Sequence, residues 1–234
     1  MRTSEPAIAK KLSGDERRAS IIQAARAIFA NKGFKGTTTR ELAAAAGVSE
    51  ALIFKHFANK EELYGAMLHA CCNNQDFHRL DQIIALEPSA LKLVRLVHAF
   101  LAVVLHERDI DGDKTIHCRL MIRSLLEDGE FVRLFLQGVS TGLEQSMLGS
   151  LQAAIAAGDA YDGPLPPQLG YWCCHHLVLM LKTYMLPATE VVDYGLPHEK
   201  VVQGAVWFSL RGFGIKEEVI HRLYHPNDQE LFGK

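Results

Sequence analysis

The spacing of apolar residues along the chain is the feature that most restricts its fold. Apolar side chains recur every three or four residues in almost every segment, and no segment shows sustained alternation of apolar and polar positions. Because this repeat gathers apolar side chains on one face of an α-helix, the sequence predicts an all-α fold. With 234 residues, 48% of them hydrophobic, the chain is long enough to bury a core.

Capping residues predict a series of short helices near the N-terminus. Ser13 precedes a glutamate by three residues and begins a helix that Gly33 ends. Thr38 repeats this pattern before a shorter helix, which Gly47 ends. Ser49 begins a third helix, so that two short amphipathic helices are joined by a turn of three residues, an arrangement typical of a helix-turn-helix.

The rest of the chain is predicted to form longer helices. A fourth helix begins near Asn59 and leads into this part, and the residues before Ser13 lack periodicity, which indicates a flexible basic arm over 1–12. Prolines, glycines and polar loops separate the later segments. The expected helices cover residues 89–107, 114–127, 130–157, 167–186, 198–212 and 216–224.

Charge is distributed unevenly between the two parts of the chain. Residues 1–60 contain 11 lysines and arginines against 5 aspartates and glutamates, whereas residues 61–234 contain 14 against 22. A basic N-terminal part on an acidic body indicates a polyanion as partner, although an ordinary solvated surface is the alternative.

The sequence also favours a cytoplasmic location. There is neither an uninterrupted apolar window of membrane-spanning length nor an N-terminal signal core, so we expect no membrane segment. The five cysteines are odd in number and include the adjacent pairs Cys71-Cys72 and Cys173-Cys174. Such a set is a poor framework for disulfides and indicates a reducing compartment.

The helix after Ser49 has the composition of a recognition helix. Small or polar residues, among them Ala51, stand at its start, where the backbone approaches the major groove. Apolar residues such as Ile53 and Phe57 supply the underside. Hydroxyl, basic and amide donors suited to phosphate surround it, and their concentration in one stretch favours DNA binding over ordinary caps and solvated charges.

Four runs in this region, 37–43, 46–49, 52–57 and 59–63, resemble the tetracycline-repressor (TetR) family, with a similarity that covers roughly residues 16–66. The resemblance implies a homodimeric transcription regulator, usually a repressor, that binds double-stranded operator DNA and responds to a small molecule. It also implies a three-helix DNA-binding domain at 13–60 and a helical ligand-binding and dimerisation domain at 61–234. By position in the family pattern, the predicted DNA contacts are Thr39, Arg40, Ser49, Ala51, Phe54, Lys55, His56 and Lys60.

The chain departs from the family pattern at two of these positions. Phe54 stands where a tyrosine often donates to phosphate, and Ala51 stands where glycine is frequent. A phenyl ring lacks the hydroxyl but can pack on a sugar or a thymine methyl group. Glu50 either faces cytosine amino groups or stabilises the helix dipole, and the dipole is the simpler interpretation. The arm residues Arg2, Lys10 and Lys11 either enter a minor groove or make no contact.

Two late segments, 167–186 and 198–212, are rich in large apolar side chains. In the TetR family, two late helices form a four-helix dimer interface, so the resemblance implies that role here, with core packing as the alternative. The expected interface residues are Tyr171, Trp172, Leu179, Val201, Gly204, Ala205 and Phe208.

A ligand pocket is expected among the helices between about residues 80 and 186. Since the body lacks a strong signal for a buried cation, the expected ligand is apolar or aromatic, and plain core packing is the alternative for each position. The predicted lining residues are Phe100, Val104, His117, Met121, Phe135, Val139, Leu143, His176 and Met180.

Other motifs leave two weaker hypotheses. The run from Cys173 to His176 suggests a metal or thiol sensor, but consecutive helical residues point around the helix, and at most two of them can bind one ion. Ser140 lies in a Gly-x-Ser-x-Gly run that suggests an enzyme, but this run lacks the preceding strand that a nucleophile elbow needs. The aspartates at 109–113 match a calcium loop only in part. We therefore predict no metal, cofactor or catalytic residue.

Overall fold

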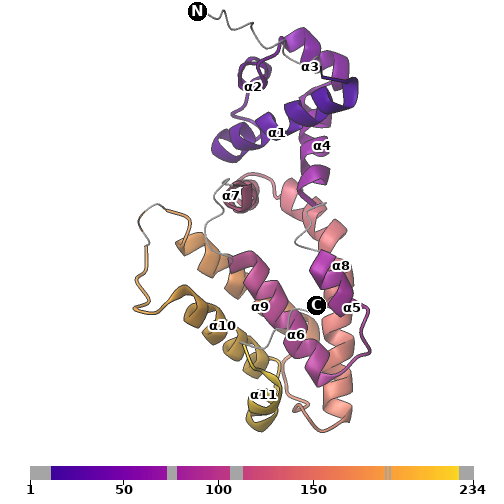
Figure 1. The fold of residues 1–234 in the computed structure, drawn as a ribbon, viewed down its shortest axis with the longest axis vertical. Coiled ribbons are helices and arrows are strands. Elements are labelled where there is room, and N and C mark those ends of the chain that lie inside the picture. The colour runs from indigo at the N-terminus through magenta and orange to yellow at the C-terminus, as the bar shows by residue number, and fades with distance from the viewer. Residues whose placement is uncertain (1–11, 73–77, 106–112, 188, 190, 227–234) are drawn as a thin grey trace, which may run out of the picture. The chain divides into compact units, whose positions relative to one another are not determined.

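The computed structural model describes residues 12–72, 78–105, 113–187, 189 and 191–226, apart from a few side chains within the helices. The chain divides into two compact units, Met1–Ala70 and Cys71–Lys234. The described residues are helical with no strand beyond an isolated bridge between Ala160 and Ile215, so the prediction of an all-α fold is confirmed (Figure 1). The predicted arm, with Arg2, Lys10 and Lys11, lies outside the described residues.

The N-terminal unit is built from short helices whose first turns are capped by side chains. Ser13 and Glu16 form a reciprocal capping box, in which the Ser13 amide donates to the glutamate carboxylate at 2.7 Å. Thr38 and Glu41 form a second box before the next helix. These caps satisfy amides that have no partner within a helix. The helices are α1 (Gly14–Lys32), α2 (Thr39–Ala46), α3 (Glu50–His56) and α4 (Lys60–Cys72).

Helix α4 belongs in large part to the N-terminal unit. Leu63 is fully buried, and the ring of Tyr64 packs edge-on against Phe29 at 4.8 Å and against Phe34 at 5.0 Å. These contacts tie α4 to α1 and to the loop after it. The compact unit therefore extends beyond residue 60, where the predicted DNA-binding domain ends.

The second unit is a bundle arranged around α6. This helix contacts α5, α8, α9, α10 and α11 (Figure 1). Its residues Leu93, Val97 and Leu101 are completely buried. Helix α5 was not predicted from the sequence, although its buried Leu80 and Ile83 have helical spacing. The helices are α5 (His78–Ile84), α6 (Ala90–Leu105), α7 (Asp113–Leu126), α8 (Glu130–Ala156), α9 (Pro167–Tyr184), α10 (His198–Gly212) and α11 (Glu217–Leu223).

Polar side chains inside this bundle have structural roles. The buried ammonium of Lys92 donates to the carbonyls of Ile84 and Leu86 at 2.7 and 2.6 Å, which closes the end of α5. Nδ1 of His98 is hydrogen bonded to the hydroxyl of Tyr224 at 3.1 Å, which joins α6 to the residue after α11. Buried donors with partners avoid the cost of desolvation without compensation.

Two buried histidines make the stability of this unit depend on pH. Burial lowers the pKa of His98. Burial, followed by the nearby His176, lowers the pKa of His175 to about 4. The ring of His175 stacks on Phe100, and its Nδ1 is buried without a hydrogen-bond partner among the described residues. The folded bundle thus stabilises the neutral form of these two side chains relative to the charged form.

We predict that the bundle loses stability as the pH falls from about 6.5 to about 4. In this range the two histidines are protonated in the unfolded chain but remain neutral in the folded chain. The loss of stability is complete below the pKa values that the histidines have in the folded chain. Replacing His175 by phenylalanine removes a contribution of roughly 3 kcal/mol at most to this loss. Thermal unfolding of both proteins at a series of pH values measures the difference.

His221→Gln is the matched control, because His221 is exposed on α11. The change in pH dependence caused by His175→Phe should exceed the change caused by His221→Gln. Parallel curves for wild type and His175→Phe would contradict the assignment of His175.

Candidate nucleic-acid interface

A left-handed glycine sets the angle between α2 and α3. Gly47 has φ 63° and ψ 35°, and its amide bonds to the carbonyls of Ala43 and Ala44 at the end of α2. Two residues later, the hydroxyl of Ser49 accepts a hydrogen bond from the amide of Leu52 at 3.2 Å and caps α3. The predicted turn and both of its caps are present.

One face of each of these helices is buried within the unit. Leu42 on α2, Ile53 on α3 and Phe57 just after α3 are each 1% exposed. The guanidinium of Arg18 lies over the ring of Phe57 at 4.7 Å. The apolar underside predicted for the recognition helix therefore anchors it to α1 and α2.

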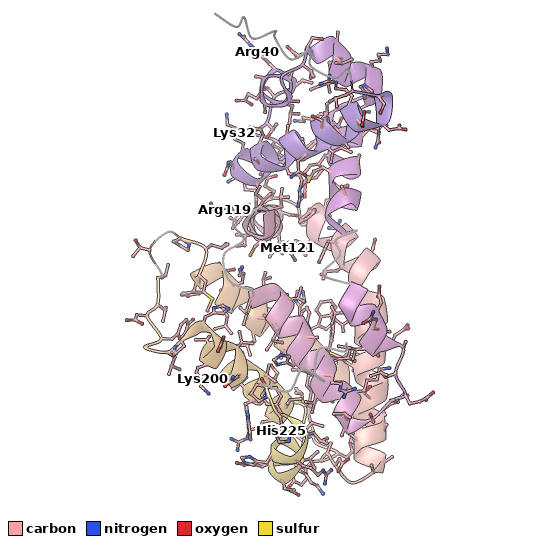
Figure 2. All side chains as sticks on the ribbon, viewed as in Figure 1. Lys32, Arg40, Arg119, Met121, Lys200 and His225 are labelled. Atoms are coloured by element: carbon pink, nitrogen blue, oxygen red, sulfur yellow. The ribbon has the colours of Figure 1, made fainter. Side chains whose placement is uncertain are left out.

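The opposite face carries most of the predicted DNA contacts. Arg40, Ser49, Ala51, Phe54 and Lys55 are exposed, and Figure 2 shows Arg40 extending outward from α2. Thr39 and His56 are partly buried. Cationic, hydroxyl and small side chains thus share one accessible surface across α2 and α3, with Glu50 as the acidic residue at the start of α3.

Lys60 is engaged inside the unit. Its ammonium donates to the carbonyls of Phe34 and Thr37 at 2.8 and 3.0 Å and lies 4.2 Å from the centre of the Phe34 ring. Thr37 in turn donates to the carbonyl of Gly33 at 2.7 Å. Lys60 therefore holds the loop that leads into α2, a role that the sequence pattern did not indicate.

Glu41 fixes the start of α2 through several hydrogen bonds. The ammonium of Lys32 donates to its carboxylate, and the amide and hydroxyl of Thr38 do so at 2.9 Å each. Lys32 first, and then Thr38, lower the pKa of Glu41 to about 2. The carboxylate is thus ionised and occupied by partners at neutral pH, and the first turn of α2 is held at the exposed surface beside Arg40.

Comparison with known proteins bears on this unit directly. Residues 21–67 match the family model described as bacterial regulatory proteins, tetR family. Residues 21–67 therefore belong to the TetR family of bacterial regulatory proteins. The resemblance predicted from residues 16–66 is therefore confirmed, and it coincides with α1 to α4.

Curated relatives of this chain are transcription regulators. The HTH-type transcriptional repressor Rv3405c of Mycobacterium tuberculosis is 32% identical over 113 residues, which is 48% of the chain and 48% of the relative. The match therefore spans about half the length of that protein. The HTH-type transcriptional regulator HbdR of an Aromatoleum species is 27% identical over 190 residues, which is 81% of the chain and 78% of the relative.

Solved structures share the fold along most of the chain. AibR, in complex with isovaleryl coenzyme A and operator DNA, has a TM-score of 0.63 and 19% identity and covers 82% of the chain and 97% of its own. SmeT, the repressor of the Stenotrophomonas maltophilia multidrug efflux pump SmeDEF, has a TM-score of 0.63 and 21% identity, with coverages of 90% and 94%.

The predicted pocket residues fall into three groups by their burial. Phe100, Met121, Phe135 and Leu143 are buried, and Val104 packs against the core (Met121 is labelled on α7 in Figure 2). The side chains of His117 and Val139 lie outside the described residues. His176 and Met180 are exposed on α9, so the prediction that they face inward is wrong. Their position on the helix puts them on the face away from the core.

The predicted dimer-interface residues also differ in their exposure. Tyr171 and Ala205 are 1% and 7% exposed in the single chain, which favours core packing, the alternative given for this segment, over contact with a second chain. Gly204 and Phe208 are exposed on α10, and Phe208 is 70% exposed. Trp172, Leu179 and Val201 are partly buried. Further exposed apolar side chains on the outer face of α9 are Leu169, Met180 and Tyr184.

The Cys/His run spreads around α9, as expected from helical geometry. Cys173 and His176 are exposed, whereas Cys174 and His175 are buried. In the part of the chain that the structure describes, no three histidine, cysteine or acidic residues gather where they could hold a metal ion. The Ser140 side chain and residues 109–112 lie outside the described residues. Among the described residues no helix has the length and apolarity to cross a membrane.

We predict that Gly47→Ala destabilises the N-terminal unit by about 1 kcal/mol or more, because a side chain disfavours the left-handed conformation. A Cβ at this position meets no atom within 4 Å, so the cost comes from the backbone alone. Urea unfolding followed by circular dichroism measures the change.

Gly65→Ala is the matched control. Gly65 lies within α4, where a Cβ also meets no atom within 4 Å, but the backbone is helical. This substitution should stabilise the unit by about 0.5–1 kcal/mol. Equal effects of the two substitutions would disprove the role of Gly47.

Proposed function

We propose that this chain is a sequence-specific transcriptional repressor that binds a palindromic operator as a homodimer and is released by a small apolar or aromatic ligand. The observation that carries the proposal is the exposed surface of α2 and α3, which places Arg40 and Lys55 beside the capped start of the recognition helix. The match of residues 21–67 to the TetR family supports it.

In this proposal α3 enters the major groove, while α2 and the ends of both helices contact phosphates. Helix N-termini and basic side chains bind phosphate, and base edges are read by the residues that face the groove. Thr39, Arg40, Lys55 and His56 supply the donors. Lys60 acts by positioning the loop before α2 rather than by giving its whole charge to DNA.

The second chain is proposed to dock on the outer faces of α9 and α10. Exposed apolar side chains on both helices, including Met180, Tyr184 and Phe208, favour burial against an equivalent face. A two-fold axis then presents two recognition helices to half-sites about one DNA turn apart.

The ligand is proposed to bind among the buried aromatic and apolar side chains of the body. AibR, which shares the fold, is described with both isovaleryl coenzyme A and operator DNA. A ligand releases DNA only if it binds more tightly to a conformation with the wrong spacing between recognition helices. The proposal includes no cofactor and no catalytic activity. Because a regulator of this kind binds chromosomal DNA, we propose that the protein acts in the cytoplasm.

Selection from a random DNA pool followed by a salt titration tests this function. We predict an enriched inverted repeat and a slope of log affinity against log salt of about −6 to −9, as expected for about seven to ten neutralised phosphates. Arg40→Ala should make the slope shallower by about 2, since each subunit loses one contact, and Lys55→Ala should weaken binding roughly tenfold or more.

Lys200→Ala is the control, because Lys200 is an exposed lysine on α10 in the second unit (Figure 2). It should change neither the affinity nor the slope. Unchanged binding by both Arg40→Ala and Lys55→Ala would rule out this surface, and failure to enrich any sequence would rule out the function.

We predict that Phe208→Glu converts the dimer to a monomer, because it introduces a charge at the proposed interface. Leu126 on α7 is 75% exposed, so Leu126→Glu makes the same kind of change outside that surface. Sedimentation equilibrium should report a monomer for the first variant and a dimer for the second. A dimer in both cases would exclude the outer face of α10.

A further inference from the structure

Phe54 presents an apolar surface on the DNA-binding face that the described residues of the unit leave half exposed. It is 50% exposed. Among the side chains that the structure describes in the N-terminal unit, Leu12 is the other large apolar residue with comparable exposure, at 37%, and it precedes α1. A phenyl ring in the middle of a capped helix is therefore unusual for this unit, and it is held there by the burial of Ile53 and Phe57 on the opposite side.

The residues around Phe54 determine which groups of DNA its ring can contact. Glu50 and Ala51 lie one turn earlier on the same exposed face, and Lys55 is adjacent. Side chains on an α-helix lean toward its N-terminus, so the position of Phe54 directs the ring toward the turn of Glu50 and Ala51, where the methyl group of Ala51 occupies little space. The ring and the carboxylate of Glu50 thus form one strip along α3.

This strip is unsuited to the phosphate backbone. A phenyl ring offers no donor to phosphate, and a carboxylate on the same strip repels it. The phosphate donors lie elsewhere, on α2 and at the ends of the helices. Position 54 is where a family tyrosine often donates to phosphate, but a ring without the hydroxyl has no such bond to make, which favours a base edge as its contact when α3 occupies the major groove.

The major groove offers one strongly apolar group, the C5-methyl of thymine. We propose that Phe54 selects a thymine in each operator half-site by packing its ring against that methyl group. The inference rests on the proposed operator binding and adds which base the recognition helix prefers. It distinguishes thymine from cytosine and uracil, which lack the methyl group.

Replacement of thymine by uracil removes only this methyl group and leaves base pairing intact. In the enriched operator, each thymine of the half-site is replaced in turn by uracil, symmetrically in both half-sites, and affinity is measured by fluorescence anisotropy. Burial of one methyl group corresponds to about a fourfold change in affinity, so at one position the wild type should lose about 15-fold over the two half-sites. Phe54→Ala should lose less than about twofold on the same replacement.

Two further variants separate a methyl contact from a general loss of binding. Phe54→Leu keeps an apolar side chain and should retain part of the preference for thymine. Lys55→Ala should weaken binding to the thymine and uracil operators by the same factor. Thermal unfolding checks that each variant is folded, as expected for exposed positions.

The remaining outcomes are distinct. Equal wild-type affinity for the parent and every uracil operator would overturn the inference while leaving operator binding intact. If Phe54→Ala weakens binding without any wild-type preference for thymine, the ring contacts sugar instead. Discrimination that persists in Phe54→Ala would assign the methyl contact to another residue. If no inverted repeat is enriched, the proposed function itself fails and the inference fails with it.

Discussion

The N-terminal unit depends on the satisfaction of helix N-termini by side chains. Helices as short as α2 and α3, with 8 and 7 residues, are not stable in isolation, because the cost of the first turn is spread over few hydrogen bonds. Ser13, Thr38 and Ser49 each supply an acceptor to an amide in a first turn. The caps decide where each helix begins and hence which of its side chains point inward. The DNA-binding face follows from that register.

The basic side chains of this unit have two roles, bonding within the unit and presenting positive charge at its surface. The sequence alone does not show which residue has which role. Lys32 and Lys60 bond to groups of the unit itself, to Glu41 in one case and to backbone carbonyls in the other. Arg40 and Lys55 extend from the exposed side. The basic character of the N-terminal part therefore includes lysines that assemble the loop before α2 as well as cations available to a polyanion.

The local signals of the sequence predicted α1 to α4 and the turn at Gly47, because caps and left-handed glycines act within a few residues of where they stand. Helix α5 was missed because it is short, and its two buried residues provide little periodicity. The orientation of α9 was also mistaken. Tyr171 and Met180 are both large residues of α9, but Tyr171 is buried in the core and Met180 is exposed. Which face of an apolar helix meets the core depends on distant helices, so its sequence does not reveal it.

The separation of the two faces of α3 has a consequence for how such a protein diverges. Ile53 and Phe57 anchor the helix, whereas Glu50, Ala51, Phe54 and Lys55 make little contact with the rest of the unit. Substitutions on the outer face change the free energy of unfolding by only a few tenths of a kcal/mol, as is usual at exposed positions. A new operator preference can therefore arise by mutation without an intermediate that fails to fold, and the same four positions form a compact library for engineering an altered target.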